Sequence, residues 1–442
     1  MKNLKIWNYI SFPWLIFTII FFVTFFLIAF LNEVDNSYLS KSYLNVLFFN
    51  TIFLSFGSAI LSALIAVPLA ILVTFYRFPG HKFFSWSLSL SIAFPAYVYA
   101  FIFVGIFEYA SPVSEYLRGF NIMLPSIKNI YGASLVMAMA LFPYIFLLTK
   151  AHLSSVGIKV FKAAKSLGDN NINAIRKVII PSLWPTITAG MALVIFETVA
   201  DFGGVSTLRV ETFTVGIYDA WFGYQSYFSA ARLAGYLLIF VFLIMLIMKY
   251  FGAKSNNLAS KTAEKFQKVE TSTFNKVIMS IICSIIFALV FCLPTSQLII
   301  WYFSDSALNI FTNLQLLINS TFVGVFASCV TVFFAISLAL SFRQLNSLKP
   351  LIIISTSGYA IPGSVISAGL LIGFHFLFDT SITFYGIFGL IICLALRFMT
   401  PAFNYISTSL LNISKSAEYA LATQPSNQLK AFSYFYLPQM KP

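Results

Sequence analysis

The sequence predicts an all-α polytopic membrane protein, and three observations lead to this prediction. Of its 442 residues, 59% are hydrophobic and only 9% are charged, which leaves more apolar side chain than a soluble domain can bury. The hydrophobic residues form runs long enough to cross a bilayer as helices. The basic residues gather in alternate loops between those runs, as expected for the cytoplasmic loops of a membrane protein.

Ten membrane spans are predicted in chain order. The first follows Lys2 and Lys5; it is too long for the core of a signal peptide and has no small-residue cleavage site. The spans lie near residues 11–31, 49–75, 86–109, 130–150, 184–203, 233–250, 276–303, 318–342, 350–378 and 383–411.

The distribution of positive charge predicts a cytoplasmic N-terminus. In that orientation 22 of the 27 Lys and Arg residues lie inside, and the opposite orientation would reverse the bias. The formal charge of +13 is therefore explained by membrane topology. We expect the chain to contact a lipid bilayer and no nucleic acid. The five basic residues that fall outside are Lys41, Arg118, Lys128, Arg209 and Arg232.

The sequence gives no sign of catalytic chemistry. All four cysteines lie in apolar spans, the three histidines are scattered, and no H-E-x-x-H or paired C-x-x-C occurs. No firm metal site is expected, no catalytic residue is assigned, and the chain is not expected to be an enzyme. It has no G-x-x-x-x-G-K-[ST] loop, so we expect it to bind no cofactor and to leave any ATP hydrolysis to a partner subunit.

Short sequence landmarks recur in one order, which predicts two parallel repeats. The first repeat is expected at 1–252, a basic cytoplasmic linker at 253–276, and the second repeat at 277–442. The recurring landmarks are Asn50–Phe53 with Asn319–Phe322, Pro95 with Pro362, and Pro181 with Pro438, at offsets of 269, 267 and 257 residues. The first repeat continues for two spans beyond its loop and the second does not, so we expect about ten spans of a full twelve.

A polar loop at 158–185 carries the pattern most suggestive of a partner. Two small residues, Ala163 and Ala164, precede Leu167 and Gly168, and a basic amphipathic run follows. Small residues allow another surface to come close, Gly168 allows a sharp turn, and Pro181 is expected to close the run before the next span. Such a helix suits docking into a groove on a soluble protein, although an ordinary cytoplasmic loop has similar chemistry.

This loop resembles the EAA loop of bacterial ABC importer permeases, which is Glu-Ala-Ala, a later Gly and a late Leu-Pro or Ile-Pro. Ala163, Ala164, Gly168, Ile180 and Pro181 match, whereas Lys162 stands where the family has Glu. A second, weaker copy lies at 413–442, with Pro425 at the glycine position. The resemblance implies that both loops dock on an ATP-binding cassette subunit dimer. The implied coupling residues are Ala163, Ala164, Leu167, Gly168, Pro181, Ala420 and Pro438.

Two carboxylates stand near the end of the fifth span. Glu197 and Asp201 are four residues apart, so we expect them on one helix face near the outer surface. Carboxylates in a span are costly and usually face a cavity or a partner. Two interpretations are open: the pair lines a cation path, or it pairs with Arg209 or Arg232.

The stretch around this pair sharpens the resemblance. The run Phe196–Gly223, with its Glu-Thr-x-Ala-Asp-Phe-Gly start, is similar to the ferric iron importer permeases. These are tandem type I ABC importer (MetI-like) proteins with six spans per repeat. The resemblance implies a bacterial inner membrane location, ferric ion as cargo and a periplasmic iron-binding protein as partner. Thiamine, phosphonate, polyamine or sulfate is an alternative cargo, and an ion-coupled secondary transporter is an alternative class.

Matched prolines suggest a substrate route. Pro95 and Pro362 interrupt equivalent spans, and such breaks often mark the binding site of a transporter. Tyr97 beside the first and Ser364 beside the second would supply oxygen atoms, which hard ferric ion prefers. Proline kinks without this role are also common in membrane helices.

Overall fold

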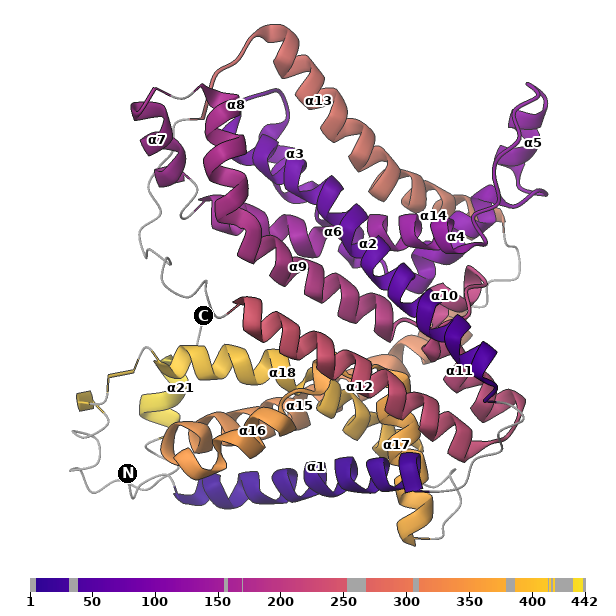
Figure 1. Ribbon diagram of the computed structural model, residues 1–442, viewed down its shortest axis with the longest axis vertical. Helices are drawn as coiled ribbons and strands as arrows, with labels where there is room; N and C mark the ends of the chain where they lie inside the picture. The colour runs from indigo at the N-terminus through magenta and orange to yellow at the C-terminus, as the bar shows by residue number, and fades with distance from the viewer. Residues whose placement is uncertain are drawn as a thin grey trace. The chain divides into compact units, whose positions relative to one another are not determined.

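The computed structural model describes residues 5–31, 39–154, 158–168, 170–252, 268–304, 310–378, 386–411, 413–414, 416–417 and 432–439. Its regular elements in these ranges are helices, labelled α, and short 3₁₀ or π turns, labelled η, which confirms the all-α prediction (Figure 1). The first half contains α1 (Lys5–Leu31), α2 (Lys41–Phe75), α3 (His81–Ser87), η2 (Leu90–Ala93), α4 (Ala96–Phe107), α5 (Pro112–Arg118), α6 (Ile130–His152), α7 (Ile158–Ser166), α8 (Asn171–Ala174), η4 (Ile175–Ile179), α9 (Ile180–Ala200), α10 (Gly203–Thr207), α11 (Phe213–Tyr218), η5 (Asp219–Gly223) and α12 (Tyr227–Gly252). The second half contains α13 (Thr273–Phe287), η6 (Ala288–Cys292), α14 (Leu293–Ser304), α15 (Ile310–Gln344), η7 (Asn346–Leu348), α16 (Lys349–Ser355), η8 (Gly358–Ala360), α17 (Gly363–Phe378), α18 (Gly386–Leu411), η10 (Phe432–Tyr436) and α21 (Leu437–Gln439).

Nine helical segments in the described part of the chain are long and apolar enough to cross a membrane. They overlap nine of the ten predicted spans. The span expected at 86–109 is divided at Pro95 into the end of α3, η2 and α4. The span expected at 350–378 is divided into α16, η8 and α17, and the described part of α17 has 16 residues. The division falls at Pro362, which lacks an N–H donor and forces the preceding residue out of the helical region.

The order of the elements repeats in the two halves. Helices α2 and α15 each have 35 residues, and α3 and α16 each have seven. A 3₁₀ turn and a proline follow in both halves. The residue before each proline is extended, with φ −91° and ψ 124° at Phe94 and φ −88° and ψ 126° at Ile361. This similarity of backbone agrees with a parallel duplication, which stays a prediction from the sequence landmarks.

The chain forms two compact units that do not follow this repeat order. The first unit comprises Met1–Tyr38, Ile217–Ile239 and Leu308–Pro442, and the second comprises Leu39–Gly216 and Phe240–Ala307. Helix α1, which is the leading (first) helix of the predicted first repeat, therefore belongs to the same unit as α15 to α18 of the predicted second repeat. The leading helical segment of the predicted second repeat, α13 to α14, belongs to the same unit as α2 to α10. The repeat boundaries at 252 and 277 stay a prediction.

The core of the second unit is the packing of α2 against α6 and α9. Small residues make this close approach possible: a Cβ added at Gly190 on α9 would meet Ile145 of α6 at 3.0 Å. The buried hydroxyl of Ser62 on α2 donates to the carbonyl oxygen of Ala138 on α6 at 3.3 Å. Exposed apolar side chains on these helices suit contact with lipid, because the bilayer is as apolar as they are.

Helices α13 and α14 pack within the second unit against α3 and α4 (Figure 1). The buried hydroxyl of Tyr99 on α4 donates to the carbonyl oxygen of Val290 in η6 at 2.9 Å. A Cβ at Gly105 would meet the ring of Trp301 at 2.6 Å, so only glycine allows this ring to lie against α4. These contacts hold α14 and the neighbouring turn η6 against α4.

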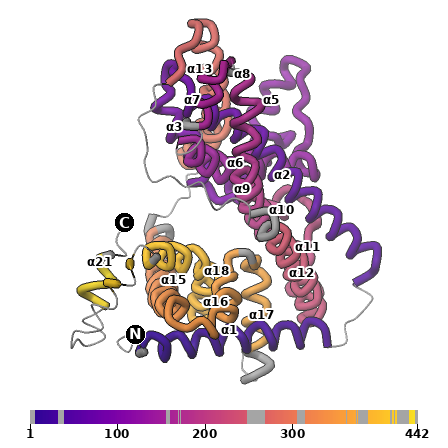
Figure 2. The backbone as a smooth tube through the Cα atoms, turned by 60° about the vertical axis from the view of Figure 1, so that its left-hand side comes forward, coloured from indigo at the N-terminus to yellow at the C-terminus, as the bar shows by residue number. Residues whose placement is uncertain are grey.

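The first unit is organised in the corresponding way around α1, which lies along α15, α16 and α17 (Figures 1 and 2). The hydroxyl oxygens of Ser11 on α1 and Ser341 on α15 are 3.0 Å apart and buried. Ser337, one turn earlier on α15, donates to the carbonyl oxygen of Trp7 at 2.8 Å. Buried polar contacts of this kind set the register of two helices in an apolar surrounding.

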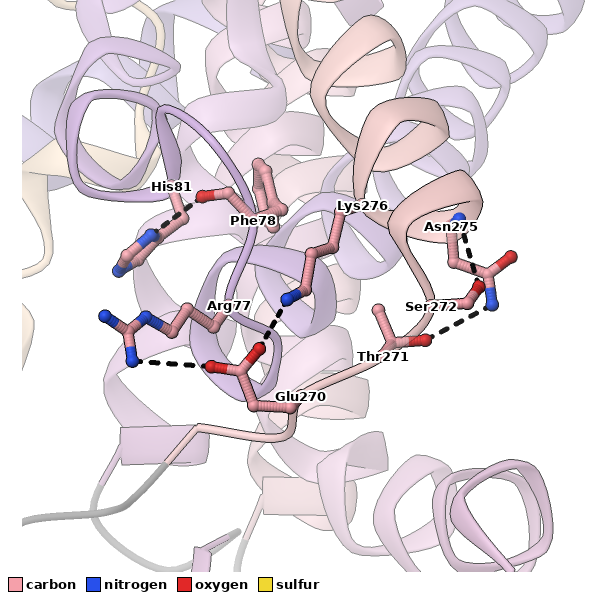
Figure 3. A network of polar contacts seen from close by, with 8 residues as sticks. All are labelled: Arg77, Phe78, His81, Glu270, Thr271, Ser272, Asn275 and Lys276. Carbon is pink, nitrogen blue, oxygen red and sulfur yellow. Dashed lines mark hydrogen bonds and ion pairs between the residues drawn. The ribbon is translucent and has the colours of Figure 1, made fainter.

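A polar clasp joins the end of the linker to the turn between α2 and α3 (Figure 3). Val269 forms a parallel bridge with Tyr76, and its N–H donates to the carbonyl oxygen of Phe75 at 2.8 Å. The carboxylate of Glu270 lies 3.4 Å from the guanidinium of Arg77 and 2.5 Å from the amine of Lys276. The clasp therefore holds the start of α13 beside the end of α2.

Lysine and serine side chains complete the helix ends at this clasp. The amine of Lys268 donates to the carbonyl oxygen of Val73 at 2.7 Å, in the last turn of α2. A cation suits this place because the carbonyl groups at a helix C-terminus carry partial negative charge. The hydroxyl of Ser272 accepts from the N–H of Asn275 at 3.4 Å and caps the start of α13.

We expect the clasp to weaken in acid. The hydrogen bond and charge of Lys276, with Arg77 adding to them, hold the pKa of the Glu270 carboxyl below its ordinary value. Its stabilising contribution is thus complete above the unfolded-state pKa and is lost as the pH falls through the lowered folded-state pKa. Glu270→Gln should slightly lower the melting temperature at neutral pH, because exposed ion pairs contribute little.

The difference between wild type and Glu270→Gln should disappear in acid, measured by thermal unfolding in detergent over a pH series. Glu211→Gln, at another exposed acidic residue, is the matched control and should not show this pH-dependent difference. A wild-type advantage over Glu270→Gln that persists after the carboxyl is protonated would contradict the assignment.

Candidate functional site

The loop at 158–185 folds as a short helix, a left-handed turn and a second helical run. Helix α7 ends at Ser166, and Gly168 takes φ +92°, a backbone conformation that favours glycine. The N–H of Gly168 donates to the carbonyl oxygen of Lys165 at 3.1 Å, which completes the helix end. A Cβ at Gly168 would meet nothing within 4 Å, so the requirement for glycine comes from the backbone and not from crowding.

The two small residues of this loop have different surroundings. Ala164 is buried, and Phe161 one turn earlier stacks on Phe75 of α2 with ring centroids 4.8 Å apart. Ala163 is exposed, and the side chain of Leu167 is 87% exposed. Helix α7 therefore contacts α2 through Phe161 and presents the small residue Ala163 on its surface, and Leu167 is exposed directly after the helix.

Pro181 does not end the helical run, contrary to the expectation from sequence. The run continues from Asn171 to Ala200, with the π turn η4 just before the proline. A wider turn accommodates the missing N–H donor and the ring of the proline. Pro438 stands in the same place, as the second residue of α21 directly after the π turn η10. Ala420, the other implied coupling residue of this copy, lies outside the described residues.

The acidic pair is arranged differently from the sequence expectation. Helix α9 ends at Ala200, and Asp201 follows with extended backbone at φ −77° and ψ 127°. The carboxylate of Asp201 accepts from the N–H groups of Gly204 and Val205 at 2.7 and 3.1 Å. It thus caps the start of α10, a structural role that neither sequence interpretation included.

Glu197 lies within α9 and is partly buried. It is one turn before the end of the helix, so the two carboxylates do not continue one helical face. The geometry does not assign Glu197 to a cation path or to an arginine partner. Both interpretations of Glu197 stay open as predictions.

The two proline breaks have different neighbours in their own units. Beside Pro95, Tyr97 is 55% exposed, and a Cβ at Gly203 of α10 would meet the Cβ of Tyr97 at 2.8 Å. Beside Pro362, the hydroxyl oxygen of Ser364 is buried and has no hydrogen-bond partner in the described part of the chain. The breaks are therefore alike in backbone and unlike in side-chain surroundings.

A pocket that sequence reasoning missed lies in the second unit, where it is lined by the end of α4, by α5 and by the loop that leads to α6. Its volume is about 320 Å³. The amine of Lys128 pairs with Glu108 at 2.7 Å, and the guanidinium of Arg118 lies 3.9 Å from the ring centre of Tyr109. Arg118 also donates to the hydroxyl of Ser114 at 3.1 Å. The available signal was that Arg118 and Lys128 are two of the five basic residues placed outside.

No group of three or more His, Cys, Asp or Glu side chains that could hold a metal ion occurs among the described residues. The described residues form a helical membrane protein with an exposed loop at α7 and Gly168 and with matched breaks at Pro95 and Pro362.

One family of known proteins matches part of the chain. Residues 66–257 match the family described as binding-protein-dependent transport system inner membrane component. This match covers less than half of the chain, and the part that it covers is similar to membrane permease components of such transport systems. This family description favours a binding-protein-dependent permease over an ion-coupled secondary transporter.

The relatives carry names that refer to two different substrates. The chain is 25% identical over 382 residues to the Fe(3+)-transport system permease protein FbpB 2 of Haemophilus influenzae, covering 84% of this chain and 72% of that protein. It is also 26% identical over 151 residues to the sulfate transport system permease protein CysT of Salmonella typhimurium and of Escherichia coli. That similarity covers 34% of this chain and 54% of each sulfate permease.

The cap at Asp201 is open to a direct test. Asp201→Ala should lower the free energy of unfolding by about 1 kcal/mol, because an N-cap acceptor is lost. Asp201→Asn keeps an acceptor oxygen and should stay close to wild type in stability. Thermal unfolding of both purified variants measures the difference.

The same two variants separate the cap from a charge on the transport path. If the charge of Asp201 is needed for transport, Asp201→Asn will lose transport while keeping its stability. Equal stability of Asp201→Ala and wild type would contradict the capping role.

Proposed function

We propose that this chain is the membrane permease subunit of an ATP-driven ABC importer for ferric iron. The observation that carries the proposal is the extent of similarity: the ferric permease matches along 84% of the chain, and each sulfate permease along 34%. The run Phe196–Gly223 supports the same cargo, since it resembles the ferric branch in sequence.

Coupling to ATP is proposed to run through α7. Its exposed residues Ala163 and Leu167, followed by the Gly168 turn, offer a small surface that fits a groove on a soluble subunit. Phe161, stacked on Phe75, would pass a push on α7 directly to α2. In this proposal a dimer of ATP-binding cassette subunits hydrolyses ATP, and the chain itself is not an enzyme and holds no cofactor.

The opposite side of the membrane is proposed to receive cargo. The positive-inside bias supports a cytoplasmic N-terminus, which places Arg118 and Lys128 outside, in a bacterial inner membrane protein. Their pocket and the exposed aromatic residues Tyr109 and Tyr116 beside it suit contact with a periplasmic iron-binding protein. Arginine and tyrosine are the residues most often found at the centre of such contacts.

Movement of cargo is proposed to use alternating access. The breaks at Pro95 and Pro362 interrupt matched spans, and broken spans in transporters border the substrate path. Tyr97, Ser364 and Glu197 are the candidate path residues near these breaks and the end of α9. Sulfate is the second candidate cargo, because the sulfate permeases also match part of the chain.

A substitution at Gly168 tests this function. Gly168→Trp introduces a bulky side chain at a position with φ +92°, so it should disturb the docking loop while leaving the membrane helices folded. In proteoliposomes with the ATPase and the binding protein, uptake of radiolabelled ferric ion should be lost. Hydrolysis should fall from its stimulated rate to its basal rate.

The matched control is Gly324→Trp, because a Cβ at Gly324 on α15 also meets nothing within 4 Å. This variant should transport normally. Full ferric uptake and stimulated hydrolysis in Gly168→Trp would refute the coupling role. Uptake of sulfate instead of ferric ion by the wild-type complex would show that the proposed cargo is wrong.

A further inference from the structure

A charged side chain lies inside a membrane-spanning helix of the first unit. Arg397 belongs to α18, about midway along the candidate span Gly386–Leu410. An ionised group at this depth is costly, and in transporters it usually serves a substrate or ion pathway. The position of Arg397 therefore makes it a candidate for such a role.

The guanidinium of Arg397 lies against the start of α17. Gly363 is the first residue of that helix, directly after Pro362, and a Cβ added to it would meet Nη1 of Arg397 at 2.9 Å. One turn before Arg397, the Sγ of Cys393 is 4.0 Å from the carbonyl oxygen of Gly363. Helix α18 thus holds its arginine beside the break in the neighbouring span.

The start of α17 is itself electropositive. The N–H groups of Val365 and Ile366 donate to the carbonyl oxygen of Pro362 at 3.0 and 3.1 Å. The N–H groups of Gly363 and Ser364 come before these and have no acceptor within the helix. A guanidinium beside a helix N-terminus adds to its positive potential, and a negative group between them would be attracted by both.

Ser364 adds a hydroxyl group to this arrangement. Its oxygen is shielded from solvent and has no hydrogen-bond partner within the described ranges. As whole residues, Gly363, Ser364 and Arg397 are only partly buried. Three kinds of hydrogen-bond donor therefore lie at or beside the first two residues of α17: the guanidinium of Arg397, the hydroxyl of Ser364 and helix N–H groups.

The matching break of the first repeat shows that the fold does not need this cation. There the start of α4 is covered by α10, and a Cβ at Gly204 would meet the carbonyl oxygen of Ala96 at 3.3 Å. The charged group on that side is the carboxylate of Asp201, which is used to cap α10. Arginine at the second break is thus specific to one repeat and is not a requirement of the helix interruption.

We propose that Arg397, the Ser364 hydroxyl and the first N–H groups of α17 form a binding site for an oxyanion, either a carboxylate or an inorganic oxyanion. The planar guanidinium suits such a group because two of its N–H donors match two oxygen atoms. The role of this site in transport rests on the proposed function. Iron would then pass this site with an oxyanion ligand attached, because a bare trivalent cation is repelled by Arg397.

Binding of radiolabelled sulfate tests the site with the full chain in phosphatidylcholine nanodiscs, without the ATPase or the binding protein. The wild type should bind the probe saturably, and unlabelled citrate should compete. Arg397→Gln should weaken binding roughly tenfold or more, since it removes the charge and the paired donors. Ser364→Ala should weaken it less.

Arg397→Lys keeps the charge without the two-pronged geometry and should give intermediate affinity, which preserves the test if Arg397→Gln does not fold. Lys349→Gln, a charge loss elsewhere in the same unit, should bind as wild type. The proposal is overturned if the wild type shows no saturable binding, or if Arg397→Lys and Arg397→Gln both bind as tightly as wild type.

The same oxyanion chemistry occurs in the phosphate of a lipid headgroup, and a second set of nanodiscs separates the sources. If a lipid phosphate is the natural occupant, adding phosphatidylglycerol will suppress sulfate binding to the wild type. If the anion comes with the cargo, sulfate binding will be unchanged. Sulfate binding without ferric uptake in proteoliposomes would refute only the proposed transport function, whereas ferric uptake without sulfate binding would refute only this site.

Discussion

The fold depends on the packing of α1 with α15 to α17 and of α13 and α14 with α3 and α4, which is an exchange of leading helices between the two predicted repeats. Inside a bilayer, helices gain nothing by hiding apolar surface from one another, so close packing and buried hydrogen bonds must specify the partners. The contacts between Ser11 and Ser341 and between Tyr99 and Val290 meet this need, one in each unit. Neither repeat forms its compact unit from its own helices alone.

Packing within each unit fixes the positions of the clasp, of helix α7 and of Arg397. The clasp at Glu270 fixes the start of α13 beside the end of α2, and the stacked rings of Phe161 and Phe75 fix α7 on the same helix. The proposed docking loop and the clasp therefore share α2 as their support. In the first unit, α18 holds Arg397 against the break before α17. Backbone symmetry between the repeats supplies two similar breaks, and side-chain differences give them different chemistry.

Several features could be predicted from residues that restrict the backbone directly. Pro95 and Pro362 predicted matched interruptions, because proline limits both itself and the residue before it. Gly168 predicted a turn, and it has the positive φ that a glycine allows. Apolar length predicted nine of the spans found among the described residues. At 350–378 the proline divides the hydrophobic run, and the described part of α17 has 16 residues.

Other features depend on tertiary contacts that no local pattern specifies. The exchange of α1 and α13 was not predicted, since apolar membrane helices look alike on faces that meet lipid and faces that meet protein. Asp201 was placed on a helix because spacing alone does not show that α9 stops at Ala200. Arg397 was counted only as an inner charge, because its importance comes from Gly363 on another helix.

Cysteine crosslinking of the exchanged helix is the most direct test of this account. The chain would carry Ser11→Cys and Ser341→Cys, with its four natural cysteines replaced by alanine and a protease site placed in the linker between the repeats. Because the two serine oxygens are 3.0 Å apart, oxidation followed by cleavage should leave the two halves joined until a reducing agent is added. Either single-cysteine variant should fall into separate halves. Separation of the halves in the oxidised double variant, with normal membrane insertion, would contradict the exchange.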